Sequence, residues 1–565
     1  MAAKTKIAEK KAVQNIPSNS VLKIGNKTFT FTQEEKISYI LLALLLFLVV
    51  FIRVNFLNIP YERDEGGYSY YGKLLLEGKI PYKDFYEQKL PGIFYFYAFM
   101  VSIFGSTVKG MHLGFIYLNV ASILFIYFAV KRLFSPGAAI VSATTFALVS
   151  LTPNLSGFTI QGEHGVAFFT SMGIYLYAVA TQTKKWYWYF IFGLSLGTAF
   201  MIKTTGLFMM FWGGVILITD FIFTKERNFK EFFKNLFLYG AGASSIIIIL
   251  LLIIYMKGAF NDMIFWVYDI PKYYVNRIPL EEGMKYFDYS KDAIVQNYKF
   301  LWIHGCLAVL LCITKSVNFK TKCFVISLAV LSFMTIVPGY YFYGHYWIQT
   351  IPGLSVLSGI TFFYILIILK NQFKLTSPNV TYVYLAIFTV FTLFHLSKLK
   401  NYYFSPNYES ILRTVYGNNP FPETMAIADY INSIAKPEDQ LAVFGSEPEL
   451  FIYTNKKSPT RHVFFSTIVA SIPEHKKFQR EFASDIEKAK PKYFVFYRHS
   501  VSLLVQANVD QYVFEWANKF INANYKLIGL VDMVDGQRST YIFDESAQKY
   551  QPKSQNFIMI FERKS

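Results

Sequence analysis

Long apolar segments alternate with short polar connections up to about residue 398. A helix needs about twenty apolar residues to cross the hydrocarbon core of a membrane. Eleven segments are close to this length and are predicted to be membrane spans, near residues 37–57, 110–131, 135–153, 162–182, 186–201, 204–223, 236–256, 300–315, 321–338, 346–369 and 379–397. Another apolar stretch, 91–105, is shorter and rich in aromatic residues, so we expect an amphipathic helix in the plane of the membrane surface.

Lysine and arginine collect on every second connection between these spans. Cytoplasmic loops of membrane proteins are enriched in these residues. With the tail at 1–36 in the cytoplasm, the basic connections contain Lys131, Arg132, Lys184, Lys185, Lys225, Arg227, Lys230, Lys234, Lys315, Lys320, Lys322, Lys370 and Lys374. The external side then receives the connections at 58–109, 154–161, 257–299 and 338–347, the turn at Lys203 and the chain beyond 398.

Beyond residue 398 the charged fraction rises and the apolar residues form short runs. The runs LAVFG (441–445), KYFVFY (492–497), YKLIGLVD (525–532) and STYIFD (539–544) predict strands. Periodic polar stretches near 422–435, 474–489 and 510–523 predict helices. We therefore expect a polytopic α-helical membrane domain at 37–398, with about eleven spans, and an external α/β domain at 399–565.

Composition agrees with a membrane protein that has the bilayer as a partner. The chain has 565 residues, of which 53% are hydrophobic and 16% are charged, whereas soluble proteins contain about 25% charged residues. The net charge of +18 is accounted for by topology signals, so nucleic acid is not expected as a partner. The first span should act as an uncleaved signal-anchor. The histidines lack metal-ligand spacing, so we predict no catalytic metal and no cofactor.

The stretch YERDEGG at 61–67 places charged residues immediately after the first span. One interpretation is a solvated loop with surface ion pairs. The other is a polar site at the membrane surface, where apolar surroundings strengthen electrostatic interactions. The second is favoured because Asp64 closely follows the span, Gly66 and Gly67 permit a sharp reversal, and EQKLPG places Glu87 and Lys89 beside an apolar segment.

The first span, the Asp-Glu pair and the following YYGKLLLEGKIPYKDFYEQKLPGIFYF resemble the first external loop of the family-39-like GT-C glycosyltransferases. This group includes protein O-mannosyltransferases and bacterial lipid A aminoarabinose transferases. Other stretches resemble the group in the same order: GEHGVAFFTSMGIYLYA (162–178), GTAFMIKTTGLF (197–208), GHYWIQTIPGLSVLSG (344–359) and FGSEPELFIYTNKKSPTRH (444–462).

The resemblance implies a GT-C fold in a bacterial cytoplasmic (inner) membrane, with a cytoplasmic N-terminus and a periplasmic C-terminal domain. The implied activity is inverting transfer of a hexosyl or pentosyl group from a polyprenyl-phosphate-linked donor. The acceptor would be a hydroxyl group of a protein, lipid A or a surface glycan on the external face.

The resemblance also assigns residues. Asp64 falls on the catalytic aspartate and Glu87 on the second acidic residue of the loop, while Lys89 lies within one residue of a basic position. The aminoarabinose transferases have an arginine three residues after the aspartate, where this chain has Gly67, and Arg63 is the candidate replacement. An inverting transfer needs a base for the acceptor proton and a cation for the departing phosphate. Asp64 is the expected base, with Glu65 as the alternative.

Four further residues are candidates for binding the donor or acceptor, and three of them have a plain structural alternative. Lys203 lies in an apolar stretch, where a charge is costly and indicates function, or it extends to the membrane interface. Glu163 binds a ligand or complements a helix dipole. His345 contacts phosphate or sugar, or belongs to an interfacial aromatic belt. Arg277, with Lys272 nearby, is placed to cover the donor head group.

Two other functions compete with the enzyme. A transporter or flippase of lipid-linked sugars would place charges at the bilayer midplane and show inverted repeats, whereas here the polar residues collect on one side. A catalytically silent scaffold, whose α/β domain binds a partner, is less favoured because the loop contains both acids, Asp64 and Glu87. The sequence therefore favours the glycosyltransferase.

Overall fold

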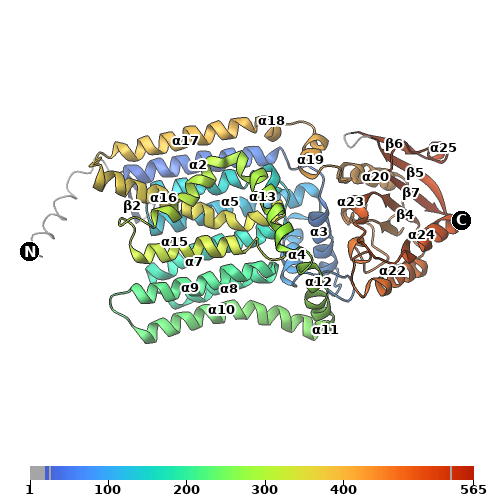
Figure 1. Cartoon of the computed structure of the whole chain (residues 1–565), viewed down its shortest axis with the longest axis horizontal. Coiled ribbons are helices and arrows are strands. Elements are labelled where there is room, and N and C mark those ends of the chain that lie inside the picture. Colours follow the sequence, from blue (N-terminus) through green and yellow to red (C-terminus); the bar gives the residue numbers. More distant parts are fainter. Residues whose placement is uncertain (1–19, 25–26, 535–537, 565) are drawn as a thin grey trace, which may run out of the picture.

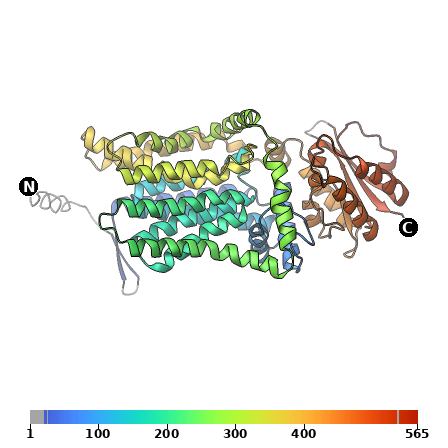
Figure 2. The same ribbon diagram turned by 60° about the horizontal axis from the view of Figure 1, so that its bottom comes forward.

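The computed structural model describes residues 20–24, 27–534 and 538–564. Long helices run side by side in a bundle, and a mixed α/β region lies at one end of it (Figure 1). At the opposite end, β1 (Ser20–Ile24) pairs antiparallel with β2 (Lys27–Phe31) ahead of the first bundle helix. The two ends of the bundle thus differ in what covers them, and the turned view shows the same arrangement (Figure 2).

Each segment predicted to be a span contains a helix. The helices are α2 (Gln33–Val54), α5 (Val108–Leu133), α6 (Pro136–Val149), α7 (Gly162–Thr183), α8 (Trp186–Ile202), α9 (Leu207–Phe223), α10 (Phe229–Met256), α14 (Lys299–Leu311), α15 (Phe319–Met334), α16 (Ile351–Gln372) and α17 (Asn379–Lys398). Within the described chain, seven helical segments are long and apolar enough to cross a membrane. This confirms the polytopic class, and the number of crossings stays a prediction.

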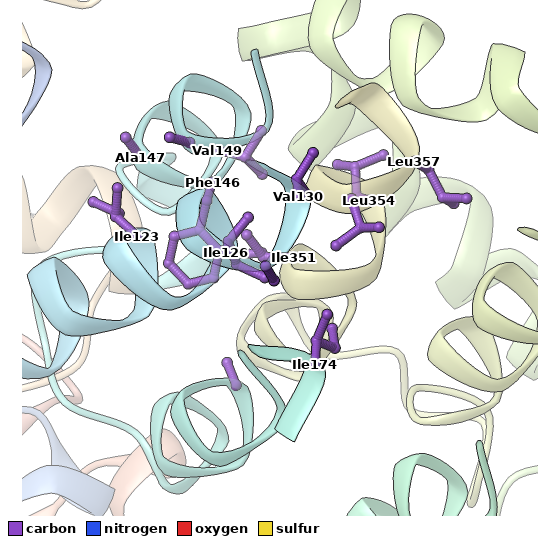
Figure 3. Packing of buried hydrophobic residues seen from close by; sticks show 14 of the residues in the cluster. Ile123, Ile126, Val130, Phe146, Ala147, Val149, Ile174, Ile351, Leu354 and Leu357 are labelled. Carbon is purple, nitrogen blue, oxygen red and sulfur yellow. The ribbon is translucent and has the colours of Figure 1, made fainter. Parts of the chain in front are cut away.

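The bundle core is apolar and closely packed. Figure 3 shows Ile126 of α5 close to Phe146 of α6 and Ile351 of α16, and all three are buried. Small residues allow other helices to approach each other, as is common in membranes. A Cβ atom at Gly193 of α8 would lie 1.9 Å from the carbonyl oxygen of Tyr239 in α10. The crossing of these two helices therefore requires glycine.

Several short helices lie between the bundle and the α/β region (Figure 1). They are α3 (Arg63–Leu76), α4 (Gly92–Phe104), α11 (Phe260–Ile264), the π-helical turn η3 (Phe265–Asp269), α12 (Pro271–Val275) and α13 (Leu280–Val295). The stretch 91–105 is thus helical as expected, and its orientation in the membrane plane stays a prediction. These helices come from the connections predicted to share the external side.

The C-terminal α/β region has a five-stranded sheet with strand order β3-β4-β7-β5-β6. Its strands are β3 (Leu441–Phe444), β4 (Tyr493–Arg498), β5 (Tyr525–Met533), β6 (Ser539–Phe543) and β7 (Phe557–Arg563), and only β3 and β4 pair in parallel. The helices include α20 (Phe421–Ile434), α21 (Glu449–Tyr453), α22 (His475–Ala489) and α24 (Tyr512–Asn524). The four predicted strands and three predicted helices are confirmed, whereas the central strand β7 was not predicted.

Candidate active site

The first turn of α3 is held by the chain around it. Glu62 is the N-cap residue, and its Oε1 accepts hydrogen bonds from the backbone N of Glu65 at 2.6 Å and from Nε2 of Gln161 at 2.7 Å. Burial, and then the charge of Asp64, raise the pKa of Glu62 to about 8. A protonated Glu62 still accepts both hydrogen bonds, so the cap is compatible with a neutral carboxyl group.

Glu65 fixes the same turn to the bundle. Its side chain is fully buried, and its Oε1 lies 2.9 Å from Nε2 of His112 and accepts a hydrogen bond from the backbone N of Ile160 at 3.0 Å. These partners belong to α5 and to the connection before α7. Glu65 thus points into the protein, with structural contacts on Oε1, while its buried Oε2 has no hydrogen-bond partner within the described residues.

Arg63 points in another direction, toward the C-terminal α/β region. Its guanidinium donates to the carbonyl oxygens of Ser446 at 2.5 Å and Val501 at 2.9 Å, and it lies 3.1 Å from Oε1 of Glu447. A fourth contact, at 3.3 Å, reaches Oδ1 of Asn419. The structure therefore places Arg63 in the contact between α3 and this region.

Asp64 lies between Arg63 and Glu65 in the first turn of α3 and is partly exposed. Within the described residues, no hydrogen bond or ion pair engages its carboxylate. Its negative charge nevertheless contributes to the pKa of Glu87, Lys203 and His345, so these groups lie within its electrostatic reach. Asp64 is therefore the acid of the first turn that remains free to meet a ligand.

Glu87 and Lys89 lie in the connection between α3 and α4. Burial raises the pKa of the Glu87 carboxyl, while the charge of Lys89 opposes this shift and that of Asp64 reinforces it. The backbone N of Gln88 donates to Oε1 of Glu87 at 2.7 Å. The fields of Lys89 and Asp64 both reach Lys203. Asp64, Glu87 and Lys89 thus lie within electrostatic reach of one another, and their role in a common site stays a prediction.

A second group of predicted residues consists of Lys203, Glu163 and His345. Lys203 caps the C-terminal end of α8, forms an ion pair with Glu163 of α7, and places its Nζ 3.8 Å from the ring centre of Tyr346. Nε2 of His345 lies 3.8 Å from the same Glu163 carboxylate. Asp64 and Lys89 act electrostatically on both Lys203 and His345. Segments far apart in sequence therefore form one charged cluster.

Aromatic rings border this cluster. Tyr274 and Tyr341 stack with ring centres 4.2 Å apart, and Tyr343 contacts Tyr341, His345 and Tyr346. The connection between α15 and α16 adopts left-handed backbone at Tyr340 and Phe342, with φ of 58° and 45°. This conformation is uncommon for large side chains.

Burial raises the pKa of Tyr341 and Tyr343, and the positive charge of the exposed Arg277 opposes this rise. The charge of Asp64 also reaches Tyr343. Arg277 and Asp64 thus both lie within electrostatic reach of Tyr343.

Two glycines of α3 have a different role from the one expected. Gly66 and Gly67 lie inside the helix and make no reversal. A Cβ atom at Gly66 would lie 2.4 Å from Cβ of Glu449, and one at Gly67 would lie 2.4 Å from Cζ of Phe464. The expectation of a sharp turn was therefore wrong, because the glycines allow the C-terminal α/β region to pack directly on α3.

Sequence reasoning missed the residues that hold this site, including His112, Gln161, Glu447 and Glu449. The run FGSEPELF gave a signal, since two acids within an apolar strand-like segment are unusual, but it did not reveal their partner. Both oxygens of the buried Glu449 lack a hydrogen-bond partner within the described residues, and burial, with the Glu447 charge, raises its pKa. The described residues contain no group of three potential ligands that could hold a metal ion.

Comparison with known proteins gives matches in sequence and in structure. The sequence model of the family described as dolichyl-phosphate-mannose-protein mannosyltransferase matches residues 88–255. ArnT from Cupriavidus metallidurans bound to undecaprenyl phosphate matches with a TM-score of 0.53 and 13% sequence identity, over 80% of this chain and 92% of ArnT. No curated protein matches the sequence.

A second structural match is the archaeal oligosaccharyltransferase AglB from Archaeoglobus fulgidus in complex with an inhibitory peptide and a dolichol-phosphate. Its TM-score is 0.50 at 11% sequence identity, over 91% of this chain and 75% of AglB. The fold is thus that of GT-C glycosyltransferases, and the chain resembles family-39 members of that class. With its apolar helices, it is a multi-pass membrane protein.

Proposed function

We propose that this chain is an inverting glycosyltransferase that moves a hexosyl or pentosyl group from a polyprenyl-phosphate-linked donor to an acceptor hydroxyl. The observation that carries the proposal is the Asp64 carboxylate. It has no bonded partner within the described residues and acts on the charged cluster of Glu87, Lys89, Lys203 and His345. Such a cluster supplies both a base and cations for a departing phosphate.

In the proposed reaction, Asp64 takes the proton of the acceptor hydroxyl while the oxygen of that hydroxyl attacks the anomeric carbon. The bond between that carbon and the lipid-phosphate oxygen breaks, and the phosphate leaves with the electron pair. Lys89 and Lys203 stabilise the negative charge on the phosphate. Because attack and departure occur on opposite faces of the sugar, the configuration inverts.

The other predicted residues have supporting roles in this proposal. Glu65 is less suited to be the base, since its carboxylate is fully buried and its Oε1 is held by His112 and by the backbone N of Ile160. Glu163 orients Lys203, and His345 contacts the phosphate or a sugar hydroxyl beside them. Glu87 orients Lys89 and binds the sugar, and Arg277 covers the donor head group from the outer edge. Arg63 would position Asp64, in place of the phosphate contact expected from sequence.

The structural matches support a lipid-linked donor. ArnT was crystallised with undecaprenyl phosphate and AglB was determined with a dolichol-phosphate, and both share the fold. The acceptor of this chain is proposed to be a protein, lipid A or a surface glycan. A transporter would need charges near the bilayer midplane, whereas Asp64 belongs to α3, which lies between the bundle and the α/β region (Figure 1).

The distribution of positive charge supports the proposed location. The chain would span a bacterial cytoplasmic membrane, with the tail at 1–36 inside and the membrane domain at 37–398. The domain at 399–565 would lie outside, in the periplasm. Helix α3, which contains Asp64, and the α/β region lie at the same end of the bundle (Figure 1), so both face the same compartment in this arrangement.

The test is sugar transfer from a radiolabelled polyprenyl-phosphate donor in membranes that contain either the wild type or Asp64→Asn. Lipids that co-purify with the protein, identified by mass spectrometry, would guide the choice of donor. We expect transfer by the wild type and a strong loss in Asp64→Asn at equal expression. Unchanged transfer by the variant would remove Asp64 from the mechanism.

A further inference from the structure

The C-terminal α/β region contains an open cavity of about 570 Å³ along one face of α22. Five of its lining side chains are cationic, namely Arg461, Lys476, Lys477, Arg480 and Lys488. Two are carboxylates, Glu481 and Asp485. The cavity therefore has an excess of positive charge, which suits an anionic ligand.

Ion pairs inside the cavity use only part of this charge. Nζ of Lys477 lies 3.8 Å from Glu481, and Nε of Arg461 lies 3.6 Å from Asp485. Within the described residues, no ion pair engages Arg480 or Lys488. Two cations on one helix face therefore remain outside ion pairs, with Arg480 over the Tyr512 ring. Glu481 and Asp485 already contact His462 and Thr460, and their remaining lone pairs can accept hydrogen bonds from hydroxyl groups.

The cavity lies directly beside the connection that contains Glu87. The backbone N of Tyr86 donates to the carbonyl oxygen of Arg461 at 3.0 Å, and the Arg461 guanidinium lies 5.0 Å from the centre of the Tyr86 ring. Tyr86 also stacks on Trp266 at 4.5 Å. A ligand held against Arg461 would thus be close to the residue that precedes Glu87.

The leaving phosphate of the donor already has cations near Asp64, in Lys89 and Lys203. A second, separate set of cations on the α/β region indicates a second charged ligand. We infer that this cavity binds a phosphate or carboxylate group of an anionic saccharide acceptor, while Glu481 and Asp485 bind its hydroxyl groups. This inference rests on the proposed function, and it assigns the acceptor to the class of anionic glycans.

The experiment uses the full-length protein in neutral detergent and two fluorescent probes, mannotriose with one phosphate group and mannotriose without it. We expect the wild type to bind the phosphorylated probe about tenfold more tightly or better, as charge-assisted contacts do. Arg480→Ala/Lys488→Ala should remove this preference. Lys519→Ala/Lys549→Ala, which removes two exposed cations outside the cavity, should retain it.

Three results would overturn the inference. In the first, the wild type shows no preference for the phosphorylated probe. In the second, the control pair removes the preference as fully as the cavity pair. In the third, the cavity pair abolishes binding to phosphatidylglycerol nanodiscs while neither oligosaccharide binds, which would assign the cavity to lipid head groups.

The probe assay is independent of transfer. Asp64→Asn should bind the phosphorylated probe normally. If no polyprenyl donor supports transfer by the wild type, the proposed function fails while the probe result still stands. If transfer occurs, the cavity pair should raise the acceptor KM by about tenfold with little change in kcat, and an unchanged KM would count against the cavity.

Discussion

The guanidinium of Arg63 lies 3.1 Å from Oε1 of Glu447, a residue 384 positions later in the chain. Arg63 immediately precedes Asp64, whereas Glu447 belongs to the C-terminal α/β region. The fully buried Glu447 also accepts a hydrogen bond from Oγ of Ser502 at 2.5 Å. Because Arg63 is adjacent to Asp64 in the sequence, this ion pair holds the backbone beside the proposed base against the α/β region.

Glu447→Ala should destabilise the protein and reduce transfer. Removing one partner of a buried ion pair leaves the other charge unpaired, which costs about 3–5 kcal/mol of unfolding free energy. Thermal unfolding in detergent measures this effect. The control is Glu562→Ala, because Glu562 pairs with Lys492 and Lys526 at the surface and should cost at most about 1 kcal/mol. Equal effects of the two variants would contradict the structural importance of the Arg63–Glu447 pair.

Asp64→Asn and Glu65→Gln should separate chemistry from structure. Losing a general base typically lowers kcat by about 10²–10⁴-fold, so Asp64→Asn should show this loss at an unchanged unfolding temperature. Glu65→Gln should instead lower the unfolding temperature, since it removes the charge beside His112. Parallel transfer and unfolding measurements check both effects. The reverse pattern would make Glu65 the base and Asp64 the structural residue.

The raised pKa of Glu62, about 8, predicts a pH dependence of stability. The native state retains the proton above the ordinary carboxyl pKa of 4.5, whereas the unfolded state loses it. The contribution of Glu62 is therefore complete below pH 4.5 and is lost as the pH rises toward 8. Glu62→Gln, which keeps the acceptor oxygen, should show a smaller fall in unfolding temperature between pH 5 and pH 8 than the wild type. Identical pH profiles would show that Glu62 titrates normally.

Gly66→Ala should weaken the contact between α3 and α21. The added methyl group would overlap Cβ of Glu449, and overpacking of this kind costs about 1–3 kcal/mol. Gly214→Ala is the matched control, because a Cβ there meets no atom within 4 Å inside a helix. That change should be neutral or stabilise by up to about 1 kcal/mol. Unfolding temperatures of both variants provide the comparison.

Local pattern predicted most of the elements. Apolar length revealed the bundle helices, and short apolar runs revealed four strands of the sheet. The central strand, β7, was not predicted although FIMIFER is as long as most of the runs that were, and its place in the sheet depends on pairing with β4 and β5. Strand order depends on tertiary pairing, which a single sequence does not display.

In the candidate site, too, the features that depend on tertiary structure could not be predicted. The position of Asp64 after the first span, together with the family resemblance, was enough to select it. The direction of each side chain was not predictable, because Glu65 turns toward His112 and Arg63 toward Glu447 only once separate elements meet. The two glycines were misread for the same reason: the atoms they accommodate belong to Glu449 and Phe464.

The pair of Lys203 and Glu163 allows charge compensation to be separated from catalysis. Lys203→Met leaves the nearly buried Glu163 carboxylate without its ammonium partner, so we expect a loss of about 3–5 kcal/mol in unfolding free energy. Adding Glu163→Gln removes the unpaired charge and should restore much of that stability. Transfer should stay low in the double variant, because no cation replaces Lys203 at the departing phosphate. If the double variant recovered transfer together with stability, Lys203 would be a structural residue and the phosphate would depend on other cations.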